Sequence, residues 1–141
     1  MSIYEGGCHC GNIQVWFKTE LSPGHLKPRS CQCSFCRKHS TRALSDGNGQ
    51  INLAIKSNAL LNRYTFGIKS AEFLICKRCG VYVSAYMPDG DKAYANVMAN
   101  TLRNHDAFPA GSPINYEIED EQGKRERRRR TWSPATLTFD D

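Results

Sequence analysis

Seven cysteines, gathered in three short segments, constrain this chain more than any other feature of its sequence. Thiols two or three residues apart rarely satisfy disulfide geometry, which places the two Cα atoms about 5.5 Å apart with suitable side-chain vectors. The odd number also argues against a complete disulfide framework. Cysteines with such spacing readily bind one metal ion together. The segments are Cys8-His9-Cys10, Cys31-Gln32-Cys33-Ser34-Phe35-Cys36 and Cys76-Lys77-Arg78-Cys79.

Ligand counting divides the seven thiols between two sites. A structural zinc takes four ligands in a tetrahedron, and two pairs from distant segments would supply them. Gly80 follows the second pair and tolerates the positive φ that a zinc knuckle requires. We therefore predict a structural zinc that crosslinks two segments of a small chain. Its ligands are Cys8, Cys10, Cys76 and Cys79.

The remaining thiols, Cys31, Cys33 and Cys36, come from one short segment. Three protein ligands leave a fourth position open, as in catalytic zinc sites. We expect Ser34 to N-cap a short helix that begins near Phe35. The helix dipole and the following Arg37 would then favour the thiolate of Cys36.

Other interpretations of the cysteines remain open. A histidine could complete the second site, and His39 is the nearest, with His9, His25 and His105 as further candidates. An iron–sulfur cluster would need four ligands and usually a different spacing. Disulfide redox chemistry of the three-cysteine segment and simple burial of unreactive thiols are the remaining alternatives.

The rest of the chain predicts an all-β protein with few short helices. Segments of alternating or β-branched residues indicate strands at intervals of roughly 10 residues. The length fits one domain, which we place at residues 1–141. Short helices are expected near residues 35–41 and 100–105. The strands are expected at residues 12–18, 51–56, 60–66, 72–76, 81–87 and 93–98.

The positive charge of the chain is concentrated near its C-terminus. Residues 124–130 carry six positive charges and one negative charge, which equals the net charge of +5 of the whole chain. An acidic stretch, Glu117–Glu121, precedes them. We expect the two stretches to pair as a hairpin, with residues 131–139 as a further strand. A solvated loop, or a patch that binds nucleic acid, an acidic protein or a phosphate, is the alternative; the absence of interleaved aromatic residues disfavours nucleic acid.

The cysteine motifs resemble the family of glutathione-dependent formaldehyde-activating enzymes and centromere protein V. Order, spacing and flanking residues all match, including the glycines around the first pair and Arg37-Lys38 after the third central cysteine. The resemblance covers about residues 4–100. The part from 108 to 141, with its arginine-rich segment 124–130, does not look like the usual end of the family.

This resemblance implies a β-tent fold of stacked antiparallel sheets, with a structural zinc on the four paired cysteines and a second zinc on Cys31, Cys33 and Cys36. It also implies a carbon–sulfur lyase similar to S-(hydroxymethyl)glutathione synthase, which condenses glutathione with formaldehyde. A thiol would take the open position on the second zinc and attack a small carbonyl compound, so these three cysteines are the expected catalytic residues. Arg37 or Lys38 would hold a substrate carboxylate.

Two other functions would fit the same sequence. One is a non-enzymatic, zinc-stabilised binding module, and the other is a thiol-redox or metal-handling protein. The expected partners are a small-molecule thiol and a carbonyl substrate, without nucleic acid or membrane, and a homodimer is a candidate assembly. No apolar run reaches the roughly 20 residues of a membrane span, and no secretory signal is recognisable, so we expect a cytoplasmic protein.

Overall fold

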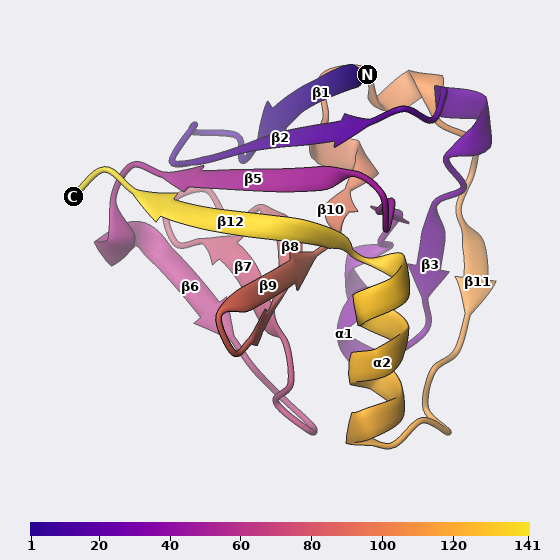
Figure 1. The fold of residues 1–141 in the computed structure, drawn as a ribbon. Helices are drawn as coiled ribbons and strands as arrows, with labels where there is room; N and C mark the ends of the chain where they lie inside the picture. Colours follow the sequence, from indigo (N-terminus) through magenta and orange to yellow (C-terminus); the bar gives the residue numbers. More distant parts are fainter.

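The computed structural model describes residues 1–141 and arranges twelve strands in two sheets (Figure 1). One sheet has eight strands in the order β1-β2-β5-β12-β9-β8-β7-β6, and the other has four in the order β10-β4-β3-β11. The strands are β1 (Ser2–Gly7), β2 (Ile13–Thr19), β3 (Arg29–Cys31), β4 (Ala43–Leu44), β5 (Gln50–Ile55), β6 (Leu61–Tyr64), β7 (Glu72–Cys76), β8 (Tyr82–Asp89), β9 (Lys92–Ala95), β10 (Val97–Met98), β11 (Ser112–Ile114) and β12 (Ser133–Phe139).

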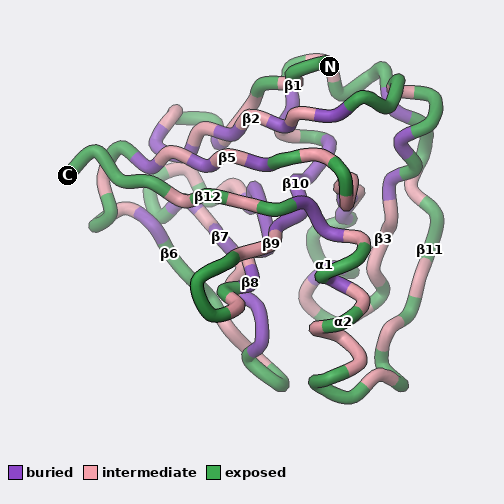
Figure 2. Tube along the Cα trace, in the orientation of Figure 1, coloured by how far each residue is buried: buried purple, intermediate pink, exposed green.

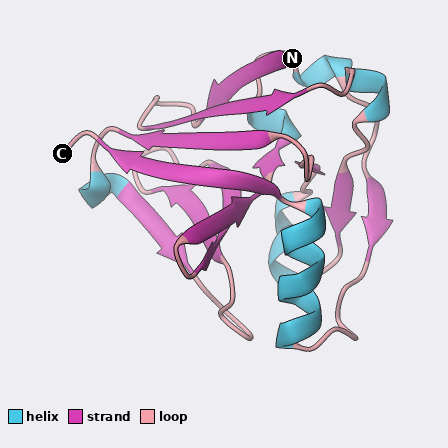
Figure 3. Cartoon of the chain, in the orientation of Figure 1, coloured by secondary structure: helices cyan, strands magenta, loops and turns pink.

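Helices are few, and the prediction of an all-β fold is confirmed (Figure 3). The α-helices are α1 (Ser34–His39) and α2 (Glu121–Thr131). Each of the 3-10 helices has three residues: η1 (Pro23–His25), η2 (Asn58–Leu60), η3 (Ala99–Thr101) and η4 (His105–Ala107). The expected strands are present within a few residues, although the one expected at 93–98 is divided between β9 and β10 of different sheets. Strand β1 and the short β3, β4 and β11 were not predicted as strands of these bounds.

The period-2 pattern of β2 builds the core. Ile13, Val15 and Phe17 are fully buried, while the residues between them are only partly buried (Figure 2). They lie opposite the equally buried apolar residues of β5 in an antiparallel register. Because alternate side chains of a strand point to one face, both strands cover the same core. Leu44 and Val97 from the smaller sheet join this cluster, so the core lies between the two sheets.

Strand β12 links the two halves of the larger sheet. Its first two residues, Ser133 and Pro134, pair antiparallel with β9, and Ala135–Phe139 pair parallel with β5. The sheet changes direction at this strand, so that β1, β2 and β5 run across the strands from β6 to β9 (Figure 1). The pair β3–β11 is also parallel. The expectation of antiparallel sheets therefore holds except for these two pairs.

The expected hairpin between the acidic and basic stretches is wrong: the basic stretch lies in α2. Asp120 caps this helix by accepting a hydrogen bond from the backbone N–H of Gly123 (2.8 Å). Glu121 and Arg125, four residues apart, form an ion pair (3.0 Å). Acidic residues at the start of a helix and arginines at its end both stabilise it, because their charges are opposite to those of the helix dipole. A helix therefore satisfies these charges locally, without a second strand.

The loop before β5 fixes the C-terminal end of α2. The Ser45 hydroxyl donates to the carbonyl oxygen of Thr131 (2.6 Å), and the backbone N–H of Asp46 donates to the Ser133 hydroxyl (2.9 Å). A Cβ atom on Gly47 would lie 2.1 Å from the carbonyl oxygen of Arg130, so the two backbones approach more closely than any other residue would permit. This close approach joins the C-terminal end of α2 to the loop before β5.

Candidate functional site

Four of the cysteines meet where two hairpin turns approach each other. Cys8 and Cys10 follow β1, Cys76 ends β7, and Cys79 lies in the turn to β8. Their sulfur atoms lie within 4.8 Å of one another, with Cys8–Cys10 at 3.8 Å and Cys10–Cys76 at 3.5 Å. A tetrahedron with zinc–sulfur bonds of about 2.3 Å has edges of about 3.8 Å. The four sulfur donors therefore fit a zinc-sized ion, as the grouping by ligand counting predicts.

Backbone amides support these sulfur atoms. The N–H of Cys79 donates to the sulfur of Cys76 (3.4 Å), and the N–H of Ile13 donates to the sulfur of Cys8 (3.2 Å). Gly80 has a φ of +80°, which agrees with the expected knuckle. Burial raises the pKa of Cys8 to about 12. A bound cation, rather than water, would have to stabilise the thiolate of Cys8.

The other three cysteines form a second group around the start of α1. Cys31 ends β3, and Cys36 is buried in the first turns of the helix. The N-cap is Cys33, whose sulfur accepts from the N–H of Cys36 (3.3 Å), and not Ser34 as expected; Ser34 is the first helical residue and is exposed. The three sulfur atoms lie within 4.8 Å of one another, so the chain also brings this set together as one potential metal site.

Hydrogen bonding between these neighbouring thiols shifts their pKa values in opposite directions. The hydrogen bond from Cys36 lowers the pKa of Cys31 to about 5, and the same bond raises the pKa of Cys36 far above its usual value. The lowered pKa of Cys31 favours a thiolate at this end of the group. Soft, negatively charged sulfur donors at this spacing fit zinc better than a hard cation such as magnesium.

No histidine or carboxylate completes the second group. His39, the nearest candidate, has its Nδ1 3.0 Å from the carbonyl oxygen of Phe35, and its ring packs on the Phe35 ring at 4.3 Å between centroids. His25 contacts the Ser22 hydroxyl (2.6 Å) and His105 contacts Asp106 (3.0 Å). The three-sulfur group instead lines a pocket, which is where a fourth ligand would have to enter.

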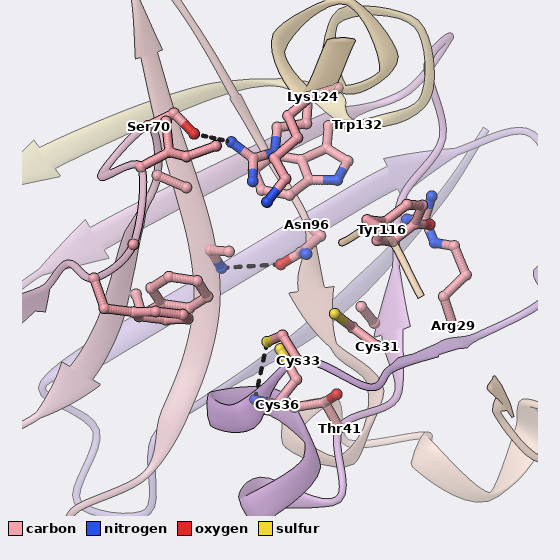
Figure 4. Close-up of a pocket in the computed structure, with 18 of the residues that line it drawn as sticks. Arg29, Cys31, Cys33, Cys36, Thr41, Ser70, Asn96, Tyr116, Lys124 and Trp132 are labelled. Atoms are coloured by element: carbon pink, nitrogen blue, oxygen red, sulfur yellow. Dashed lines mark hydrogen bonds between the residues drawn. The ribbon is translucent and has the colours of Figure 1, made fainter. Parts of the chain in front are cut away.

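This pocket separates the cysteines from residues of α2 (Figure 4). Cys31, Cys33, Cys36 and Thr41 lie at one end, and Ser70, Lys124 and Trp132 lie at the other; Arg29 and Tyr116 lie side by side between them. The Thr41 hydroxyl is buried and has no hydrogen-bond partner in the protein. Aromatic and aliphatic side chains form the remaining wall, among them Phe66, Phe73, Tyr82, Ala85 and Met98.

Sequence reasoning missed the contribution of α2 to this pocket. Lys124, Arg127 and Arg128 all line it, whereas Arg125 and Arg129 reach Asp89 of β8 on the other side of the helix. Residues three and four positions apart lie on one face of a helix. The spacing of Lys124, Arg127 and Arg128 would therefore have indicated a shared face if the segment had been predicted as a helix. The arginine-rich segment is therefore divided between a structural face and a pocket face.

Arg37 and Lys38, the residues expected to hold a substrate carboxylate, lie elsewhere. Both are exposed on α1, and neither lines the pocket beside the three cysteines. Their role stays a prediction that no contact supports. The basic residues that line this pocket are instead Arg29, Lys69, Lys124, Arg127 and Arg128.

Comparisons with known proteins identify relatives of the chain. A family model described as "Glutathione-dependent formaldehyde-activating enzyme" matches residues 3–118, a longer part than the motifs alone indicate. A crystal structure of a Rhodobacter sphaeroides protein is 26% identical, with a TM-score of 0.49, over 70% of this chain and 87% of that one. A search of curated proteins finds no match. None of the helices is both long enough and apolar enough to span a membrane.

Proposed function

Since the chain belongs to the family of glutathione-dependent formaldehyde-activating enzymes, we propose that it is a zinc-dependent enzyme of the carbon–sulfur lyase type, which joins a thiol to a small carbonyl compound. Glutathione and formaldehyde are the first substrates to test. The observation that carries the proposal is the convergence of Cys31, Cys33 and Cys36 at one end of a pocket, in a group that no histidine or carboxylate joins. All seven cysteines lie within the matched residues, whereas α2 does not.

The two cysteine groups would have different tasks. The group with four thiols has no vacant ligand position and would hold a structural zinc between the β1–β2 and β7–β8 turns. The group with three thiols would hold the second ion next to the pocket. A zinc ion bound there supplies a position at which an incoming thiol is kept as its thiolate at neutral pH.

The chain's own side chains would handle the oxygen of the carbonyl compound. As the sulfur–carbon bond forms, one electron pair of the C=O bond moves to the oxygen, which then takes up a proton. The unpartnered Thr41 hydroxyl lies at the cysteine end of the pocket and can donate a hydrogen bond to this oxygen. The product keeps all atoms of both substrates, so the step needs neither an oxidant nor a reductant.

The contacts of α2 do not favour the alternative of a tail that binds nucleic acid. Arg125, Arg127 and Arg129 are each paired with a carboxylate, and Arg128 is buried. Counterion release requires cationic groups that are free to meet phosphates. This segment offers few of them.

The test is the exchange between glutathione and 13C-formaldehyde, followed by NMR on protein reconstituted with two zinc ions per chain. We expect the protein to accelerate formation of the hydroxymethyl thioether and Cys36→Ser to slow it by more than about 100-fold. Ser34→Ala, on the same helix but exposed and without a ligand role, is the control and should retain the native rate. Equal rates for Cys36→Ser and native protein would contradict the proposal.

A further inference from the structure

Arg128 is buried without an acidic partner. Only 9% of the residue is exposed. Its Nη1 donates to the Ser70 hydroxyl (2.7 Å) and approaches the sulfur of Met87 (3.8 Å), and its guanidinium carbon lies 4.8 Å from the centroid of the Trp132 ring. Its Nε is buried and has no hydrogen-bond partner. These neighbours are all uncharged, so no anion of the protein contacts the guanidinium directly.

The neighbouring arginines on α2 differ in this respect. Arg127 contacts both carboxylate oxygens of Glu119 at 3.0 Å, and Arg129 contacts Asp89 at 2.8 Å. Buried charges in proteins are normally paired, because removing an ion from water is costly. Three less buried arginines of α2, Arg125, Arg127 and Arg129, each contact a carboxylate, whereas the buried Arg128 contacts none, so the position lacks an anion.

The missing anion would lie in the pocket. Arg128 lines the pocket together with Lys124, which lies one helical turn earlier on the same face and also has no acidic partner. Figure 4 shows Lys124 close to Trp132, across the pocket from the cysteines. The only carboxylate among the lining residues is Glu117, against several basic side chains. The positive potential at this end of the pocket therefore favours an anionic ligand.

We infer that Arg128 and Lys124 form a carboxylate-binding subsite, so that the substrate thiol of this enzyme carries a carboxylate at the end remote from its sulfur. The inference rests on the proposed function for the position of the sulfur. The guanidinium fork suits both oxygens of a carboxylate, and Lys124 adds a second positive charge. Both residues lie beyond the family match at residues 3–118, so the subsite belongs to this chain's own C-terminal helix.

The test compares two probes that differ in charge: 3-mercaptopropionate and its methyl ester, titrated into zinc-loaded protein. The chain has two tryptophans, which give two indole N–H resonances. Trp132 lies beside Arg128 and reports on the subsite, while Trp16, in β2, is the internal reference. We expect saturable movement of the Trp132 signal, with the acid binding at least about tenfold more tightly than the ester.

Arg128→Met removes the charge and keeps the bulk, and it should bring the two affinities within about twofold of each other. Lys124→Gln, at a less buried position, should reduce the preference for the acid in part. Arg130→Gln is the matched control: it makes the same charge change on the same helix at an exposed residue, and the preference should persist. Replacing an unpaired buried charge by an apolar group is often neutral or stabilising, so Arg128→Met should keep the native Tm.

Several outcomes would overturn the inference. These are equal binding of acid and ester by the native protein, no saturable shift with the acid, or an equal effect of Arg130→Gln and Arg128→Met. A fall in Tm for Arg128→Met with an unchanged preference for the acid would assign the residue a structural role instead. Cys36→Ser tests the proposed function separately, since loss of a sulfur site should weaken acid and ester by the same factor.

Discussion

The sulfur of Cys10 lies 3.5 Å from the sulfur of Cys76, although 66 residues separate the two in the sequence. The contact joins the turn after β1 to the end of β7, two strands that are far apart in the order of the larger sheet. No hydrogen-bonded strand pair connects these two parts directly. A metal ion held by the four cysteines would therefore close the fold at a place where the sheet alone does not.

We predict that Cys76→Ser destabilises the protein far more than Cys36→Ser. Structural zinc binding is worth roughly 10–16 kcal/mol in small zinc domains, and its loss is a loss of folding free energy. Thermal unfolding followed by circular dichroism, with and without a zinc chelator, checks this. The chelator should lower the Tm of the native protein and of Cys36→Ser, but should have little further effect on Cys76→Ser. Equal Tm values for the two variants would contradict the assignment of a structural and a pocket site.

We predict that Thr41→Val lowers the turnover of thiol and carbonyl by about tenfold without lowering the Tm. The Thr41 hydroxyl is buried and unpartnered, so its removal relieves a desolvation penalty. Thr19→Val is the contrasting control, because the Thr19 hydroxyl donates to Asp46 (2.6 Å) and accepts from the N–H of Leu21 (3.0 Å). That variant should lose about 1–3 kcal/mol of stability. A rate for Thr41→Val equal to that of the native protein would remove the hydroxyl from the proposed step.

We predict that Gly47→Ala weakens binding of the carboxylate probe although Gly47 does not line the pocket. A Cβ there would lie 2.1 Å from the carbonyl oxygen of Arg130, so the end of α2 must move, and Arg128 with it. Overpacking of this kind costs about 1–3 kcal/mol. Gly24→Ala is the control, since its Cβ would meet no atom within 4 Å. Thermal unfolding measures the loss of stability, and the indole titration measures the affinity for the carboxylate probe. If Gly47→Ala is destabilised but binds the probe with native affinity, α2 does not move.

The cysteine spacing was enough to predict how the seven thiols are grouped, because ligand number and short spacing are local properties of the chain. The alternation in β2, and in the strand from Tyr82, likewise indicated strands directly. The pocket could not be predicted in the same way. Trp132 lies four residues after Arg128 and is a local neighbour, but Ser70 is 58 residues away in the sequence, and no local pattern encodes its contact with Arg128.

The segment that became α2 shows how a charge pattern can be misread. Opposite charges on either side of Gln122-Gly123 suggested two strands that attract each other, yet the same charges suit one helix. Asp120 is an N-cap, Glu121 lies in the first turn, and Arg128 to Arg130 lie in the last. The absence of β-branched residues from 121 to 130 was the available signal against a strand.

The last prediction concerns the outer face of α2 and its dependence on pH. Asp89 accepts hydrogen bonds from Arg129 at 2.8 and 3.1 Å and lies 3.8 Å from Arg125. The hydrogen bonds from Arg129 hold the pKa of Asp89 below its usual value. A carboxyl group whose pKa is lower in the folded state stabilises the protein above its unfolded pKa of about 3.9, and this stabilisation is lost as the pH falls through the folded pKa.

Asp89→Asn should therefore lower the Tm at pH 7, and the difference from the native protein should vanish at a pH below the folded pKa. High salt should also reduce the difference at pH 7, because the pair is exposed. Asp91→Asn is the matched control, since Asp91 is exposed two residues away and forms no ion pair, so its Tm should follow that of the native protein throughout. A difference for Asp89→Asn that persists undiminished in acid would show that shape or hydrogen bonding, rather than charge, ties α2 to β8.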